Sequence, residues 1–190
     1  PEKLILSSKH ALHAAAHLLQ IKAKSGRMVP LVANQSQVRL FEAVYVQKAQ
    51  RKPVRVIVWK GRQQGLSTGV AALNFLGMQA APKSTLAITE EKGGSAQNLW
   101  DMYDRFDKGM PFELPCENTR LGHYRKYGNG SSIRVEGEKK ISSFTHQQIH
   151  LSEAPFFTRL SATLEMVLQT VPDDEGTAIF LESTANEFGM

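Results

Sequence analysis

The 190-residue sequence predicts an α/β domain with a mostly parallel central sheet flanked by helices. Two observations lead to this prediction. Short runs rich in β-branched residues, such as 54–59 and 84–89, have the near-continuous hydrophobicity of strands buried on both faces. Segments of helical length, such as 67–80, alternate with these runs. Strands that alternate with helices pack as a parallel sheet with helices on its faces.

Two helices are expected before the first buried strand. The first spans 4–24, because apolar residues recur at helical spacing and Gly26 follows as a stop. The second spans 36–50. Asn34 or Ser36 can cap it, because either side chain accepts a hydrogen bond from the free amides of the first turn.

Strands and helices then alternate to the end of the chain. The expected elements are a strand over 54–59, a helix over 67–80, a strand over 84–89, a helix ending near 106, strands over 132–136 and 149–153, a helix over 158–171 and a strand over 177–181. The region 111–130 contains proline, glycine and asparagine, and it is expected to hold loops and one short strand. A further candidate strand covers 140–144.

Composition and length indicate one globular domain over 1–190, with an N-terminal helical segment over 1–27 and a core over 28–190. No run approaches the roughly 18 apolar residues of a membrane helix, so no membrane partner is expected. The single cysteine, Cys116, excludes an internal disulfide and a multi-cysteine zinc site. The formal net charge of +5 permits contact with a polyanion such as DNA without requiring it.

A polar loop with two glycines joins a hydrophobic strand to a helix, and we call it the 60–68 loop. Its residues are Lys60, Gly61, Arg62, Gln63, Gln64, Gly65, Leu66, Ser67 and Thr68. A loop in this place presents backbone amides and a helix amino terminus to phosphate. In the usual phosphate-binding loop a lysine precedes the Ser or Thr, whereas Leu66 stands there in this chain. The alternative interpretation is a strand–helix turn that binds no ligand.

The charges and hydroxyls of the 60–68 loop suit a nucleotide. Lys60, at the start of the loop, could replace the missing lysine because its four-carbon stem can reach back across a small loop. Arg62 adds a second positive charge. Ser67 is the expected hydroxyl ligand of Mg²⁺, with Thr68 beside it.

Two other strand ends carry polar residues. ATPases with such a phosphate-binding loop carry a second apolar strand that ends in Asp-Glu. The Asp helps to hold Mg²⁺ through water, and the Glu orients the attacking water. Here that strand ends in Ser152 and Glu153, so Ser152 could bond a metal-bound water and Glu153 is the candidate base. The alternative for Glu153 is a solvated surface carboxylate. The last strand runs into 182–186, whose small polar residues could hydrogen-bond a γ-phosphate and move when it leaves.

Ligands of parallel α/β sheets bind beyond the carboxyl ends of the strands. The three polar segments, 60–68, 152–153 and 183–186, each follow a predicted strand. The sequence therefore predicts that they meet in one neighbourhood.

Taken together, these segments resemble the motifs of phage terminase large subunits, the ATPases that drive viral DNA into a capsid. Lys60-x-Arg-Gln-x-Gly-x-Ser-Thr68 resembles the variant Walker A motif of that family, in which a lysine at the start of the loop often replaces the usual one. His150-Leu-Ser-Glu-Ala154 resembles the Walker B segment of a subgroup with Ser-Glu in place of Asp-Glu. Glu182-Ser-Thr-Ala-Asn186 resembles the coupling motif, and 30–37 resembles the segment whose glutamine contacts adenine. The four motifs occur in the family's order.

The resemblance implies an ASCE-type P-loop ATPase that uses ATP and Mg²⁺. Gln37 would contact adenine, and Ser67 would bind Mg²⁺, with Ser152 contacting it through water. Lys60 and Arg62 would contact the β- and γ-phosphates, and Arg62 would act catalytically in cis. Glu153 would be the catalytic base. The residues that would couple hydrolysis to motion are Ser183, Thr184 and Ala185.

The resemblance also implies an assembly. The expected partners are double-stranded DNA, the terminase small subunit, the portal protein and further copies in a homo-oligomeric ring, in the cytoplasm of the bacterial host. A neighbouring subunit would supply an arginine, for which Arg120, Arg125 and Arg134 are candidates. Family members are usually more than twice as long and carry a nuclease domain. We therefore expect no nuclease activity here and a core truncated at its carboxyl end.

Two other functions remain open. One is a helicase-like DNA translocase, although such an enzyme would normally keep the loop lysine and the Asp-Glu pair. The other is a degenerate P-loop domain that binds nucleotide or DNA without hydrolysis. Leu66 and Ser152 favour this second alternative, because each replaces a charged residue of the usual site.

Overall fold

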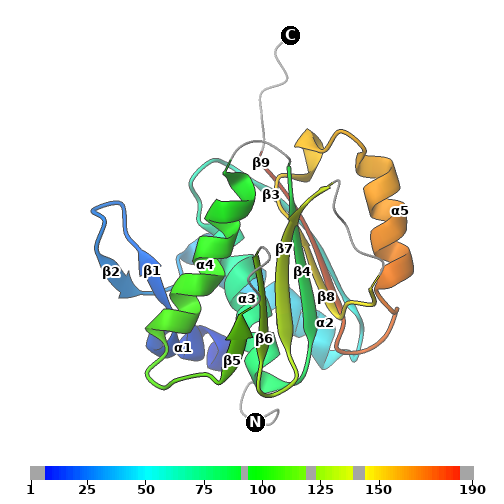
Figure 1. Cartoon of the computed structure of the whole chain (residues 1–190). Helices are drawn as coiled ribbons and strands as arrows, with labels where there is room; N and C mark the ends of the chain where they lie inside the picture. Colours follow the sequence, from blue (N-terminus) through cyan, green and yellow to red (C-terminus); the bar gives the residue numbers. More distant parts are fainter. Residues whose placement is uncertain (1–6, 91–93, 119–122, 139–143, 185–190) are drawn as a thin grey trace.

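The computed structural model of the chain describes residues 7–90, 94–118, 123–138 and 144–184. Within these residues a seven-stranded sheet has the order β3–β9–β8–β4–β7–β6–β5 (Figure 1). The first five of these strands run parallel, and β6 and β5 are antiparallel to their neighbours. The prediction of an α/β domain with a mostly parallel sheet is confirmed. The strands are β3 (Val54–Lys60), β4 (Ser84–Thr89), β5 (Cys116–Asn118), β6 (His123–Tyr127), β7 (Ser132–Gly137), β8 (Gln148–Leu151) and β9 (Ala178–Thr184).

Helices cover both faces of the sheet, with α5 on the face opposite α3 (Figure 1). Helix α3 packs against the sheet and also contacts helices α1, α2 and α4, which explains why most of its residues are buried. Among the described residues no helix is long and apolar enough to cross a bilayer. The helices are α1 (Ser8–Leu18), α2 (Gln35–Ala49), α3 (Leu66–Ala80), α4 (Ser95–Gly109), the 3₁₀ turn η3 (Ala154–Phe156) and α5 (Leu160–Thr170).

Strand β4 shows why the apolar runs of the sequence are continuous. Leu86 and Ile88 point into the core beneath α5, and Ala87 between them points into the core beneath α3. All three side chains are fully buried. A strand with helices on both faces favours apolar residues at consecutive positions, and Leu86, Ala87 and Ile88 of β4 provide them.

The first helix is shorter than predicted, and a hairpin follows it. Helix α1 ends at Leu18, and β1 (Gln20–Lys22) pairs antiparallel with β2 (Met28–Pro30). Gly26 lies in the turn with φ of 83°, a conformation that glycine adopts without strain. The predicted helix over 4–24 is therefore too long, and the segment 1–27 is not helical throughout. Gly26 marks the hairpin turn rather than the end of a helix.

The later elements follow the prediction closely, with one important difference. Strand β9 continues to Thr184, three residues beyond the predicted end at 181. The extension places Glu182 and Ser183 inside the sheet, where both are buried. The candidate strand over 140–144 falls largely on residues 139–143, which lie outside the described residues.

A buried histidine makes the fold sensitive to acid. His146 precedes β8, and its Nδ1 lies 2.8 Å from Ser84 Oγ. Burial, together with the charge of Arg134, lowers the pKa of His146 to about 4. Because the unfolded chain takes up this proton first, stability is retained above about pH 6.5 and falls as the pH decreases from there to about 4.

We expect His146→Gln to remove this part of the acid sensitivity. At about 1.4 kcal/mol for each pKa unit, wild-type protein should lose about 3 kcal/mol of unfolding free energy through this group between about pH 7 and pH 4. Urea denaturation of both proteins at the two pH values measures the difference. An equal loss in the variant would contradict the assignment.

Candidate nucleotide site

The strand order brings the predicted polar segments together. Strand β9 lies between β3 and β8, with Lys60 in register with Thr184 and Leu151 in register with Leu181. The 60–68 loop, Ser152–Glu153 and the end of β9 therefore meet at the carboxyl edge of the sheet, as predicted. Contacts between their side chains, described below, confirm the meeting.

The backbone of the 60–68 loop turns sharply into helix α3. Gln63 and Gly65 have φ angles of 60° and 71°, and the helix begins at Leu66. Gly65 holds the N-cap position and provides no side-chain cap, so the first amides of α3 stay available to an anion. A Cβ at Gly65 would lie 3.1 Å from Gln37 Nε2, so a larger residue would meet both backbone strain and a close contact.

The amino end of α2 holds this loop in place. Asn34 and Gln37 form a capping box, in which Gln37 Oε1 accepts from the Asn34 amide at 3.0 Å. Gln37 Nε2 donates to the Gly65 carbonyl at 2.8 Å, and Asn34 Nδ2 donates to the Gln64 carbonyl at 3.0 Å. Gln37 therefore positions the loop. Its contact with adenine stays a prediction.

A buried carboxylate, Glu182, lies at the centre of the site. Its Oε1 accepts hydrogen bonds from Lys60 Nζ, from Ser67 Oγ at 2.6 Å and from Ser152 Oγ at 3.4 Å. Its Oε2 lies 3.1 Å from His150 Nε2. The side chains of Glu182 and His150 have no exposed surface, and that of Lys60 is 7% exposed. Polar side chains from β3, from the start of α3, from β8 and from the residue after β8 thus converge on one carboxylate.

Glu182 is ionised at neutral pH. Burial by itself would raise the pKa of Glu182, but the hydrogen bond and charge of His150 and the ammonium of Lys60 outweigh burial and lower the pKa to about 2. A buried ion pair is costly to break from one side, because the remaining charge has no counter-ion. Lys60 and Glu182 are therefore interdependent.

Glu153, the predicted base, is tied to the end of β9. Its Oε1 accepts from Thr184 Oγ1 at 2.7 Å, and its Oε2 accepts from the Thr184 amide at 3.2 Å. Lys60 Nζ lies 3.4 Å from the same Oε1. The side chain is 29% exposed, and the residue has a left-handed backbone with φ of 56°. Glu153 is thus a held carboxylate rather than a freely solvated one.

The other residues of the loop point in different directions. Ser67 faces Glu182, whereas Thr68 Oγ1 lies 3.9 Å from Met102 Sδ on α4. Leu66 is buried in the core. Arg62 is exposed, and Gln63 accepts a hydrogen bond from Lys24 of the hairpin turn at 3.1 Å. Of the two neighbouring hydroxyls, Ser67 is the one placed to serve a metal.

The coupling residues and the candidate arginines are only partly described. Ser183 is buried and its Oγ donates to the Thr184 carbonyl at 3.1 Å, while Ala185 lies outside the described residues. Arg125 pairs with Asp104 and Asp107, joining β6 to α4 within the chain. Arg134 pairs with Glu136 at 3.2 Å. Arg120 also lies outside the described residues, so its role stays a prediction.

Two residues of the cluster had no predicted role. Glu182 and His150 lie within motifs named from the sequence, yet neither was assigned a function. The signal available for Glu182 was a carboxylate directly after the apolar run 178–181. Such a residue needs a buried partner, and the sequence does not show which one.

The oxygens of this cluster suit a magnesium ion that is bound together with a nucleotide. The described residues contain no group of three or more His, Cys, Asp or Glu side chains that could hold a metal by themselves. Mg²⁺ in nucleotide sites needs only one or two protein ligands, because phosphates and water complete its shell. Ser67, Ser152 and Glu182 supply hydroxyl and carboxylate oxygens, and the Lys60 ammonium stands between Ser67 and Glu182 as a cation.

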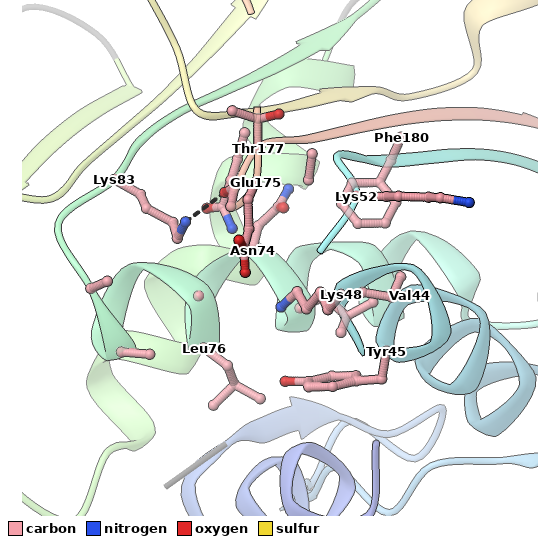
Figure 2. A pocket seen from close by; sticks show the side chains of 17 residues that line it. Val44, Tyr45, Lys48, Lys52, Asn74, Leu76, Lys83, Glu175, Thr177 and Phe180 are labelled. Carbon is pink, nitrogen blue, oxygen red and sulfur yellow. Dashed lines mark hydrogen bonds between the residues drawn. The ribbon is translucent and has the colours of Figure 1, made fainter. Parts of the chain in front are cut away.

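A separate hollow of about 260 Å³ lies at the other end of the sheet (Figure 2). It is bordered by Lys48, Lys52 and Lys83, and Lys83 Nζ donates to the Gly176 carbonyl at 2.6 Å. The hollow also contains Gln148 and Ala178, which begin β8 and β9, so it lies away from the carboxyl edge and the predicted site.

The fold of this chain is that of phage large terminases. The HK97 bacteriophage large terminase superposes with a TM-score of 0.73 at 12% identity, over 93% of this chain and 37% of that one. A large terminase from a thermophilic bacteriophage, in complex with ATP-γ-S, gives 0.56 at 12% identity, over 78% and 37% of the two chains. A variant of the Thermus phage P74-26 large terminase ATPase domain gives 0.55 at 15% identity, over 82% and 66%.

The chain thus spans about 37% of the length of the HK97 protein and of the thermophilic-phage protein that carries ATP-γ-S. No protein-family model matches the sequence, and a search of curated proteins found no match. The resemblance seen in the motifs is confirmed in three dimensions, at the level of fold.

The hydrogen bonds of Gln37, which join the amino end of α2 to the 60–68 loop, predict a measurable effect on stability. Gln37→Ala removes two hydrogen bonds, one in the capping box and one to the Gly65 carbonyl. We expect a loss of about 1–2 kcal/mol in unfolding free energy, measured by urea denaturation. Gln35→Ala is the matched control, because Gln35 is exposed on the same helix and its loss should change stability by less than about 0.5 kcal/mol. Equal effects of the two substitutions would contradict the stabilising role of the Gln37 hydrogen bonds.

Proposed function

We propose that this chain is the ATP-hydrolysing motor part of a phage large terminase, which uses ATP and Mg²⁺ to move double-stranded viral DNA into a procapsid. One observation carries the proposal. Lys60, Ser67, Glu153 and Glu182 converge beside a loop that opens helix α3, at the carboxyl edge of a parallel sheet. The fold adds support, since a thermophilic-phage large terminase with this fold has been seen with ATP-γ-S.

The 60–68 loop would bind the phosphates. Its amides and the amino end of α3 offer hydrogen bonds and a favourable dipole to an anion. Lys60 and Arg62 supply two positive charges to the β- and γ-phosphates, in place of the single lysine of the usual loop. Gln37 would contact the adenine. Phosphate binding requires Lys60 to leave Glu182, because the ammonium cannot serve both anions from its present position.

Glu153 would align the attacking water. Its carboxylate is held at both oxygens by Thr184, which leaves the remaining lone pairs to accept a water proton. The oxygen of that water forms a bond to the γ-phosphorus while the bond to the bridging oxygen breaks, giving ADP and phosphate. Mg²⁺, held by Ser67 with Ser152 behind a water, would neutralise charge on the phosphate oxygens.

The same contact links hydrolysis to movement. Thr184 ends β9, and it holds the base by two hydrogen bonds, so a shift of Glu153 on phosphate release would pull on this strand. Ser183, Thr184 and Ala185 would pass that shift to a surface that grips DNA. In the assembled motor the partners would be the small subunit, the portal protein and neighbouring copies in a ring, one of which supplies an arginine. The location would be the cytoplasm of the bacterial host.

A second candidate is a nucleotide-binding domain without turnover. The neutralisation of Lys60 by Glu182 favours it, because phosphate must first displace a buried counter-ion. Binding and hydrolysis therefore need separate measurements.

Nucleotide binding tests the first part of the proposal. We expect wild-type protein to bind ATP in the presence of Mg²⁺ by calorimetry, and Lys60→Ala to bind at least about ten-fold more weakly, because a charge-assisted contact to phosphate is lost. Lys22→Ala is the matched control, since Lys22 is exposed on the hairpin. Circular dichroism at the assay temperature checks that each variant is folded. A folded wild-type chain that does not bind ATP would overturn the proposal.

Hydrolysis tests the second part. Glu153→Gln should keep ATP affinity within about three-fold and lower turnover by about 100-fold or more, the usual contribution of a general base. Phosphate release with DNA present measures turnover. Unchanged turnover in Glu153→Gln would refute the role of Glu153, and binding without turnover by the wild type would favour the second candidate.

A further inference from the structure

Ser152 follows strand β8 at the position where a metal-binding aspartate would be expected, and the carboxylate of Glu182 stands on the neighbouring strand β9. We propose that Glu182 on β9 supplies the acidic group of the magnesium site that Ser152, directly after β8, does not, and that the Lys60 ammonium fills this cation position until nucleotide binds. The inference rests on the proposed function and assigns a further residue to its site.

The register of the sheet puts the two side chains at equivalent places. Leu151 pairs with Leu181 in parallel strands, so Ser152 and Glu182 are the next residues in step. Neighbouring residues in register point to the same face of a sheet. Ser152 Oγ lies 3.4 Å from Glu182 Oε1, so a carboxylate on either strand reaches the same region.

The partner of Glu182 is the hydroxyl that a P-loop gives to magnesium. In P-loop NTPases the ion lies between the Ser or Thr of the loop and an acid at the end of a strand. Ser67 Oγ lies 2.6 Å from Glu182 Oε1, and Glu182 is the carboxylate that Ser67 contacts directly. Ser67 and Glu182 thus provide the hydroxyl and the carboxylate of such a magnesium site, and the carboxylate comes from β9 instead of from the end of β8.

The Lys60 ammonium lies among three side-chain oxygens of the site. Lys60 Nζ contacts Glu182, lies 2.7 Å from Ser67 Oγ and lies 3.4 Å from Glu153 Oε1. The ammonium therefore lies where three side-chain oxygens meet, as a bound cation would. When Lys60 turns to phosphate, a fully buried carboxylate remains, and a divalent cation would replace the lost charge.

His150 keeps the carboxylate turned toward this position. Its Nε2 contacts Glu182 Oε2, the oxygen directed away from the loop, so Oε1 is left for Ser67, Ser152 and Lys60. Both residues have no exposed surface. His150 is thus a positioning residue, and Glu182 is the group that would face the ion.

The simpler role for Glu182 is that of a structural counter-ion of Lys60. The roles of metal ligand and of counter-ion predict different effects when the carboxylate of Glu182 is removed or moved. A metal-site carboxylate can be moved to the neighbouring strand and still serve the ion, because Ser152 reaches the same region. If Glu182 is only the counter-ion of Lys60, the single variant Glu182→Gln should leave Mn²⁺ binding unchanged, because no ligand of the ion is lost.

The test therefore moves the carboxylate. We compare wild type, Glu182→Gln and the double variant Ser152→Asp with Glu182→Gln, and Glu165→Gln on the exposed face of α5 is the matched control. Calorimetry gives ADP affinity with Mg²⁺ and with a chelator, and electron paramagnetic resonance gives Mn²⁺ binding in the presence of ADP. We expect Glu182→Gln to weaken Mn²⁺ binding by roughly 10- to 100-fold and the double variant to regain most of it.

The outcomes separate this inference from the proposed function. A wild type that binds no nucleotide would overturn both. Nucleotide binding with Mn²⁺ affinity unchanged in Glu182→Gln, or with no recovery in a folded double variant, would overturn only the role of Glu182. If Glu182→Gln does not fold, Glu182→Asp preserves the charge and should still weaken Mn²⁺ binding several-fold, and an unchanged affinity would overturn the inference.

Discussion

The buried ion pair between Lys60 and Glu182 is the interaction on which the site depends. It joins the end of β3, where the 60–68 loop begins, to the middle of the site on β9. A carboxylate without exposed surface must keep a cation beside it, because an unpaired charge in the protein interior is costly. Release of Lys60 to a phosphate would leave Glu182 with His150 as the remaining partner that can carry a positive charge among the contacts described above, so another positive charge would offset the cost. On the proposed function, this constraint would make phosphate binding and metal binding parts of a single event.

The order of the strands makes this coupling possible. Because β9 lies between β3 and β8, it touches the loop through Glu182 and the candidate base through Thr184. A change at Lys60 can thus reach Glu153 through neighbouring contacts of one strand. On the other side of the loop, Gln37 and Asn34 hold the carbonyls of Gly65 and Gln64. Hydrogen bonds from Asn34 and Gln37 hold the loop backbone on the side of α2. On the side of β9, the contact between Lys60 and Glu182 would have to break when phosphate binds.

The sequence predicts the elements of this site better than its electrostatics. Apolar runs identified β3, β4, β8 and β9, and the polar residues after β3 and β8 located Ser67 and Glu153. Pairing of 20–22 with 28–30 in a hairpin ended the first helix early, and such strand pairing overrides helical periodicity without leaving a clear pattern in the sequence. The partners of Glu182 were hidden for the same reason. Only the order β3–β9–β8 places it beside Ser67 and Ser152, and spacing along the chain does not contain that order.

The most direct test of the account is a crystal structure of the chain with ADP and Mn²⁺, in which anomalous scattering locates the ion. The account predicts a manganese peak beside Ser67 Oγ with the Glu182 carboxylate facing it, directly or through one water, and Lys60 turned to the phosphates. A structure in which Lys60 still contacts Glu182 while nucleotide and manganese are bound elsewhere would contradict the exchange of cations that the account requires.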